Sequence, residues 1–134
     1  LSGMAERGDG RMMKRKIKIT VGKLELEAWL NDTKTAAKVF EALPMTSTIN
    51  TWGDEIYFTI PVEAGSEHAQ ELVSLGDIAY WPPGKALCVF FGRTPISKGE
   101  EIRPASPVNI IGKVEGDLKL LKKVKDGEEI TIRR

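Results

Sequence analysis

Short segments of alternating apolar and polar residues, separated by turns rich in glycine and proline, recur along almost the whole chain. Within residues 16–29, two such segments flank a turn at Gly22, and Ile17, Ile19 and Leu26 lie on the apolar side of this pattern. An alternation with a period of two is typical of β-strands that bury one face. Many short strands joined by tight turns favour a β-barrel or a β-sandwich.

Six further strands are expected after this first hairpin. Their ranges are 46–52, 55–61, 77–81, 86–91, 108–114 and 129–133. The segments 53–54 and 82–85 have the residues of tight turns, so each joins two neighbouring strands. Residues 62–76 and 92–107 lack a strand pattern, and we expect them to form loops. The hairpin and the six segments together make eight strands.

Two short helices are expected between the strands. The first begins after a capping residue at 32–33 and ends at Pro44, which cannot continue a helix. We expect Ala37 and Phe40 to face the core, with Ala36 as a further candidate, and a second short helix at 117–124. The apolar residues that recur at helical spacing in the first helix are Ala36, Ala37, Phe40 and Leu43. Each helix is placed where it can cap one end of a barrel.

The length of the chain, 134 residues, suits one domain with one core. Residues 1–13 show no structural pattern, and we interpret them as a disordered leader or an expression remnant before a domain at 14–134. The chain contains no apolar run of the ~20 residues that span a bilayer, so no membrane partner is expected. Its one cysteine, Cys88, rules out an internal disulfide and suits the cytoplasm; we expect this thiol to pack as a small apolar residue.

Charge and motifs exclude several function classes. The chain has 20 basic and 19 acidic residues, and five basic against two acidic residues in 1–16 put its basic excess there. A nucleic-acid partner is therefore not expected, since such partners need a basic face on the fold itself. There is no Cys/His cluster for a metal, no glycine-rich phosphate loop and no nucleophile elbow. We accordingly expect no metal and no cofactor.

Three pieces of the sequence resemble the cyclophilin family, in the family's order. Residues 40–43, Phe-Glu-Ala-Leu, are similar to its Asn-Phe-x-x-Leu helix, with Val39 in place of the asparagine. Residues 53–61, Gly-Asp-Glu-Ile-Tyr-Phe-Thr-Ile-Pro, resemble its Gly-x-x-Phe-His-Arg-x-Ile-Pro strand. Residues 112–118 and 130–132 resemble its Gly-Lys-Val-x-x-Gly stretch, short helix and closing Ile-x-Ile strand. The resemblance implies a mainly β fold, a closed eight-stranded cyclophilin-like barrel with two short capping helices.

Other stretches resemble a compact archaeal and bacterial branch of uncharacterised cyclophilin-like proteins. These are residues 30–33, residues 76–84 and residues 90–95. The departures from active cyclophilins bear on function. The arginine that polarises the prolyl amide in the family is replaced by Phe58 in this alignment, or by Tyr57 if the alignment slips by one residue. The family's Gln-Gly-Gly-Asp segment has no counterpart in 62–76, so the resemblance implies the fold and leaves the presence of enzyme activity open.

Aromatic residues gather between positions 52 and 91, where seven of the nine in the chain are found. Phe58 shares a strand face with Ile56 and Ile60, so we expect it in the core. The neighbours Phe90 and Phe91 cannot both point inward, and the same holds for Tyr80 and Trp81. An outward aromatic on each of two adjacent strands can form the floor of a groove, as an alternative to aromatics covered by loops. The candidate ligand-binding residues are Trp52, Glu55, Tyr57, Trp81, Phe90, Phe91 and Arg93.

Three functions remain open at this point. The first is a binding module that holds a peptide or small molecule in the aromatic groove without standard prolyl isomerase catalysis. The second is a weak or atypical prolyl isomerase, which would need Tyr57 or Arg93 to point into the groove. The third is a small-molecule enzyme with Glu55 as its base, which a raised Glu55 pKa would favour. A solvated strand face with a stray ion pair is an equally good interpretation of Glu55 and Tyr57. The sequence leaves the oligomeric state open.

Overall fold

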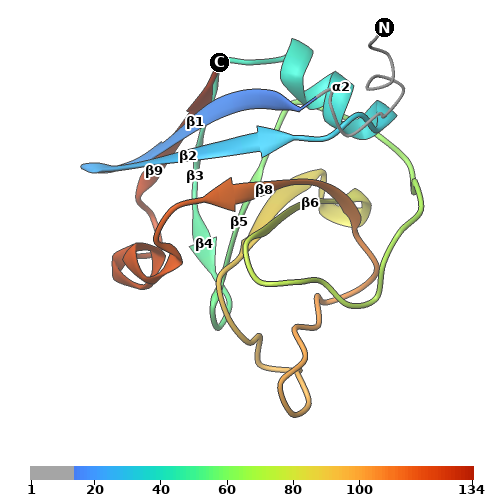
Figure 1. Ribbon diagram of the computed structural model, residues 1–134, viewed down its shortest axis with the longest axis vertical. Helices are drawn as coiled ribbons and strands as arrows, with labels where there is room; N and C mark the ends of the chain where they lie inside the picture. The colour runs from blue at the N-terminus through green and yellow to red at the C-terminus, as the bar shows by residue number, and fades with distance from the viewer. Residues whose placement is uncertain (1–13) are drawn as a thin grey trace, which may run out of the picture.

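The computed structural model describes residues 14–134, so the expected leader at 1–13 lies outside the described residues. The elements are β1 (Arg15–Val21), β2 (Leu24–Leu30), α2 (Lys34–Glu41), β3 (Met45–Thr48), β4 (Asn50–Thr51), β5 (Glu55–Thr59), β6 (Asp77–Trp81), η2 (Pro82–Gly84), β7 (Ala86–Phe90), β8 (Asn109–Glu115), η3 (Leu118–Lys123) and β9 (Glu129–Arg133). In Figure 1, α2 lies at one end of the molecule and the loop near residue 100 projects from the other.

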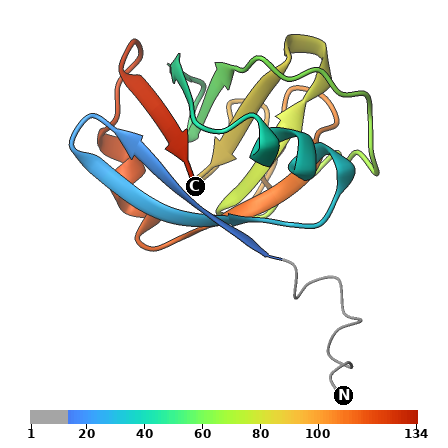
Figure 2. The ribbon, with the colours of Figure 1, turned by 90° about the horizontal axis from the view of Figure 1, so that it is seen from above.

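The strands form one antiparallel sheet in the order β3-β9-β1-β2-β8-β6-β7-β5-β4. Its two edge strands, β3 and β4, belong to the single segment 45–51, which is interrupted at the fully buried Ile49. Because β3 pairs with β9 while β4 pairs with β5, this segment joins both ends of the sheet and closes the barrel. Figure 2 shows the strands curving around a common interior.

The expected mainly β barrel is therefore confirmed, with nine strands in place of eight. The count differs because the expected strand 46–52 is divided into β3 and β4 by the bend at Ile49. The other strand ends differ from the expected ranges by at most two residues.

Side chains of the alternating pattern fill the interior of the barrel. In β1 and β2 the residues Ile17, Ile19, Leu26 and Ala28 are all buried, as the period of two predicts. Phe58 of β5 is 1% exposed and packs in the same core. The burial of such side chains is the main favourable contribution to the stability of the fold.

The first helix begins directly after the expected capping position and ends at Glu41, shortly before Pro44. Thr33 caps it, with its Oγ1 accepting a hydrogen bond from the backbone N–H of Ala36. The buried residues of the helix are Thr35, Ala36 and Val39. Ala36 therefore faces the core as expected, Phe40 is half-buried and packs against the core, and the expectation was wrong for Ala37, which is half-buried and outside the core cluster.

Phe40 has another environment at the edge of the barrel. The guanidinium carbons of Arg15 and Arg134 lie 5.8 and 4.5 Å from the centre of its ring. Two cations over one aromatic ring are a favourable arrangement at a partly exposed site. Phe40 therefore packs partly against the core and partly against these two cations.

The second expected helix is the six-residue 3-10 helix η3 rather than an α-helix. Asp117 caps it by accepting a hydrogen bond from the backbone N–H of Lys119. Only Leu121 is buried, while Leu118 and Val124 are half-buried against the core. No helix within residues 14–134 is both long and apolar enough to cross a membrane.

The loops 62–76 and 92–107 fold back over the outer face of the barrel. An isolated bridge joins Gln70 of the first loop to Val108, directly before β8, and a second joins Val73 of the first loop to Ile102 of the other. Beneath them lies a second apolar cluster, separate from the barrel core, which consists of Ala79, Cys88, Phe90, Ile102 and Val108. Strands β5, β6 and β7 therefore bury side chains on both faces, and the outer face is where the candidate site lies.

Candidate functional site

A cavity of about 160 Å³ opens on the outer face of the barrel, and we call it the outer-face pocket. Strands β5, β6 and β7 supply its floor, and the segment 104–108 supplies its roof. Trp52, Tyr57 and Trp81 remain partly exposed at its rim, which leaves the pocket accessible from solvent. The lining residues are Trp52, Glu55, Tyr57, Trp81, Cys88, Pro104, Ala105 and Val108.

Strand pairing explains why these residues meet. Tyr57 of β5 is paired with Cys88 of β7, and Cys88 is paired in turn with Ala79 of β6. Residues directly opposite in adjacent strands point to the same face of a sheet, so all three side chains lie on the outer face. Glu55 lies two residues before Tyr57 and shares this face.

Glu55 is the one acidic residue among the described residues that line the pocket. Its side chain is 5% exposed, which differs from the solvated strand face that we had considered. Burial raises the pKa of this carboxyl to about 7, and a hydrogen bond with the Cys88 thiol opposes the rise. Its Oε1 has no hydrogen-bond partner among residues 14–134. A buried carboxyl oxygen without a partner is unusual in a folded protein and calls for an explanation.

Cys88 lies against this carboxyl and is itself 3% exposed. Burial and the neighbouring Glu55 carboxyl both raise the pKa of the thiol well above its ordinary value. The thiol is therefore neutral at physiological pH, and a neutral thiol is a poor nucleophile. Cys88 shapes the floor of the pocket, in keeping with its expected role as a small packing residue.

The rim of the pocket is aromatic. Trp81 ends β6, and its indole Nε1 donates a hydrogen bond of 2.6 Å to the hydroxyl of Ser106 in the roof segment. Trp52 precedes the turn into β5, and its backbone N–H donates to the carbonyl of Glu55 at 2.9 Å. The first contact joins Trp81 to the roof, and the second joins Trp52 to strand β5 of the floor.

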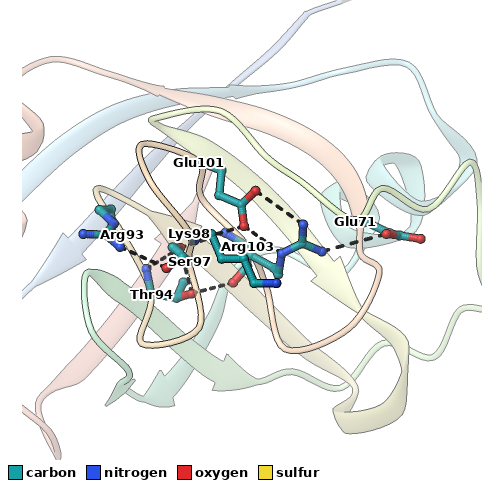
Figure 3. A network of polar contacts seen from close by, with 7 residues as sticks. All are labelled: Glu71, Arg93, Thr94, Ser97, Lys98, Glu101 and Arg103. Carbon is teal, nitrogen blue, oxygen red and sulfur yellow. Dashed lines mark hydrogen bonds and ion pairs between the residues drawn. The ribbon is translucent and has the colours of Figure 1, made fainter.

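A network of polar contacts stabilises the loop 92–107, from which the roof is built (Figure 3). The buried hydroxyl of Ser97 accepts hydrogen bonds of 3.0 Å from the backbone N–H groups of Thr94 and Arg103. The guanidinium of Arg103 bonds Glu101 at 2.8 Å and lies 3.9 Å from Glu71 of the other loop. The hydrogen bond from Arg103 is the main reason that the pKa of Glu101 is lowered. These contacts fix Arg103, which directly precedes the roof segment 104–108.

We expect Ser97→Ala to destabilise this loop. The variant leaves the two N–H groups of Thr94 and Arg103 without their acceptor, at a cost of about 1–3 kcal/mol. Hydrogen exchange should show faster exchange of both amides, while the amides of β1 and β2 stay protected. Unchanged exchange at Thr94 and Arg103 would contradict the account of the loop. Ser66→Ala, at an exposed position of the other loop, is the control.

The structure brings four of the seven predicted site residues together. Trp52, Glu55, Tyr57 and Trp81 line the outer-face pocket. The other three do not line it. Phe90 packs under the loops, Phe91 packs in the barrel core, and the exposed Arg93 donates to the backbone carbonyl of Ser97 at 2.9 Å.

Phe90 and Phe91 do point to opposite sides, as strand alternation requires. Phe91 misses the pocket because it points into the barrel core, and Phe90 misses it because the covering loops occupy the space above it. Sequence reasoning missed Cys88 as a lining residue, although its pairing with Tyr57 follows from the hairpin register. It also missed Pro104, Ala105 and Val108, since no periodicity predicts where a long loop returns to a sheet.

The family's arginine aligns with Phe58 of this chain, or with Tyr57 if the alignment slips by one residue. Phe58 points into the barrel core, whereas Tyr57 faces the outer-face pocket. Of the two residues that can align with the family's arginine, only Tyr57 is therefore exposed to a ligand. A phenol can donate one hydrogen bond but carries no positive charge at neutral pH. Within residues 14–134 no three His, Cys, Asp or Glu side chains gather to hold a metal.

Comparison with known proteins agrees with this architecture. The family model described as Cyclophilin-like matches residues 15–133. A solution structure of a hypothetical protein from Archaeoglobus fulgidus is 44% identical in sequence, with a TM-score of 0.77. The match covers 90% of the present chain and 95% of that protein. No curated protein matches the chain.

Proposed function

The chain belongs to the cyclophilin-like family, and from this premise we propose that it binds a peptide or small molecule in the outer-face pocket, without standard prolyl isomerase catalysis. The observation that supports this proposal best is the buried Glu55 carboxyl, whose Oε1 lacks a partner inside an otherwise apolar pocket. A concave apolar site with one or two placed polar groups is the usual form of a small-molecule site. The single cysteine, which is buried, suits a cytoplasmic site of action.

The absence of a charged donor in the pocket supports binding over isomerisation. Among the described residues, no lysine, arginine or histidine lines the outer-face pocket. Active cyclophilins, which this chain resembles, use an arginine to polarise the prolyl amide. Within residues 14–134, Tyr57 is the one hydroxyl-bearing residue in the lining, so any isomerase activity would depend on it.

Blocking the pocket tests the proposal. Ala105 is exposed in the roof, so Ala105→Trp should fill the entrance without disturbing the fold. Calorimetric titration with a panel of X-Pro peptide amides and small alkyl and aryl compounds should identify at least one ligand. Its affinity should fall about tenfold or more in Ala105→Trp, because the new indole would occupy the space of the bound group. Glu100→Trp, exposed in the same loop but outside the pocket, should bind normally. A ligand that is unaffected by Ala105→Trp binds elsewhere and would contradict the proposal.

A second candidate function rests on the pKa of Glu55. Its value of about 7 is suited to a group that accepts and donates protons at neutral pH. We therefore retain a small-molecule enzyme with Glu55 as general acid or base. This candidate requires a turnover that is lost in Glu55→Gln and that has a pH midpoint near 7. Turnover that survives in Glu55→Gln would exclude it.

A further inference from the structure

We propose that the group bound in the outer-face pocket is a small alkylammonium cation, held by the three aromatic side chains of the rim and by the carboxyl of Glu55. This inference rests on the proposed function, because it names the ligand class of the same pocket. It follows from the combination of aromatic residues and one unpaired acid in a single small cavity.

The aromatic side chains provide the first part of the argument. Trp52, Tyr57 and Trp81 come from the connection between β4 and β5, the middle of β5 and the end of β6, and all line one cavity. Aromatic rings attract cations through the negative potential of their faces, and tryptophan does so most strongly. Sites that recognise quaternary or methylated ammonium groups combine several such rings.

The charge of the pocket provides the second part. Ionised Glu55 would be a buried negative charge, and burial without a partner is costly. The titratable groups that face it are Tyr57 of its own strand and Cys88 of β7, and both are neutral in their ordinary forms. Trp81 of β6 and the roof segment 104–108 contribute no titratable group to the lining. Nothing in the described lining compensates the carboxylate, so a cationic ligand is its natural counter-charge.

Size restricts the cation. A cavity near 150 Å³ in a protein interior accommodates a molecule of about the size of benzene. The outer-face pocket, at about 160 Å³, therefore admits a trimethylammonium group but no large ligand as a whole. The ammonium group would occupy the pocket, and the rest of the ligand would extend over the exposed rim at Ala105.

The competing interpretation is a neutral ligand. A protonated Glu55 can donate a hydrogen bond to an amide carbonyl, as a peptide ligand would offer. The two interpretations predict opposite pH dependence. A cation binds the ionised carboxylate, so its affinity rises as the pH increases through about 7 and then levels off. An amide binds the protonated acid, so its affinity falls over the same interval.

A pair of matched probes tests the proposal on the intact protein. Choline carries a trimethylammonium group, and 3,3-dimethylbutan-1-ol has the same shape without the charge. We expect NMR titration to show choline binding at Trp52, Tyr57 and Trp81, about tenfold more tightly than the neutral probe. The affinity for choline should rise about tenfold from about pH 6 to about pH 8. Glu55→Gln should abolish this pH dependence, and Asp54→Asn, a half-exposed neighbour, should preserve it.

Each other result contradicts the inference in a different way. If the neutral probe binds as tightly as choline, or if choline binding is independent of pH and of Glu55, the cation proposal is wrong while the pocket remains a ligand site. If only X-Pro peptides shift the pocket resonances, the cation proposal again fails and the proposed function stands. If no probe and no peptide shifts these resonances, both fail.

Discussion

Replacing Phe58 with arginine is expected to unfold the protein rather than to restore a cyclophilin active site. Phe58 is 1% exposed in the barrel core, and loss of a buried phenyl ring alone costs about 3–5 kcal/mol. The guanidinium would add a buried charge without a partner, which costs several kcal/mol more. These losses together approach the ~5–15 kcal/mol by which whole domains are stable. Circular dichroism and denaturant titration measure the result.

The matched variant is Tyr57→Arg, one residue earlier in the same strand. Tyr57 is half-buried at the rim of the outer-face pocket, so this change should leave the fold intact. The new guanidinium would lie near Glu55 and should lower the pKa of that carboxyl. A folded Phe58→Arg variant with isomerase activity would contradict the assignment of Phe58 to the core. It would show that the strand presents the other face to ligands.

Glu55→Gln is expected to stabilise the protein at high pH and to change it little at low pH. The carboxyl has a folded-state pKa of about 7 against an ordinary value of 4.5. In the wild type, stability from this group is therefore fully present below about pH 4.5 and is lost as the pH rises to about 7. The shift corresponds to about 3 kcal/mol, which is the cost of ionising the buried acid. The neutral amide avoids this cost.

Denaturant titrations at a series of pH values test this prediction. The difference in unfolding free energy between Glu55→Gln and the wild type should grow between about pH 4.5 and about pH 7 and then stay constant. Asp54→Asn, which removes a charge from the neighbouring half-exposed residue, should show no such growth. A flat difference for Glu55→Gln would mean that Glu55 is hydrated or paired in the folded protein.

The barrel was predictable because strand alternation depends on local sequence. The period of two placed Phe58 inside and Tyr57 outside, and it separated Phe90 from Phe91. The helix was less predictable: Ala36 and Phe40 pack at the core as expected, but the fully buried Val39 was not expected and Ala37 is only half-buried. Helix phase is set by packing against the barrel and by the caps rather than by apolar spacing alone.

The candidate site was predictable only in part. Trp52, Glu55, Tyr57 and Trp81 could be found because they lie on strands or beside them. The burial of Glu55 could not, because it results from the return of long loops to the outer face. Where such loops dock depends on contacts like the Val73 to Ile102 bridge, which join residues distant in sequence. The sequence therefore predicts a polar, solvated face for β5, whereas in the structure the loops cover this face and form a pocket over it.

The most direct test of the central claim is NMR titration of labelled protein with X-Pro peptides and small ligands, including exchange spectra of the cis and trans peptide forms. We predict shifts confined to the surroundings of Trp52, Tyr57, Trp81 and Val108, without enhanced exchange between the peptide forms. Enhanced exchange would show an isomerase that works without the family's arginine and would contradict our account of the catalyst. Shifts at other surfaces, or none at any surface, would contradict a ligand site in the outer-face pocket.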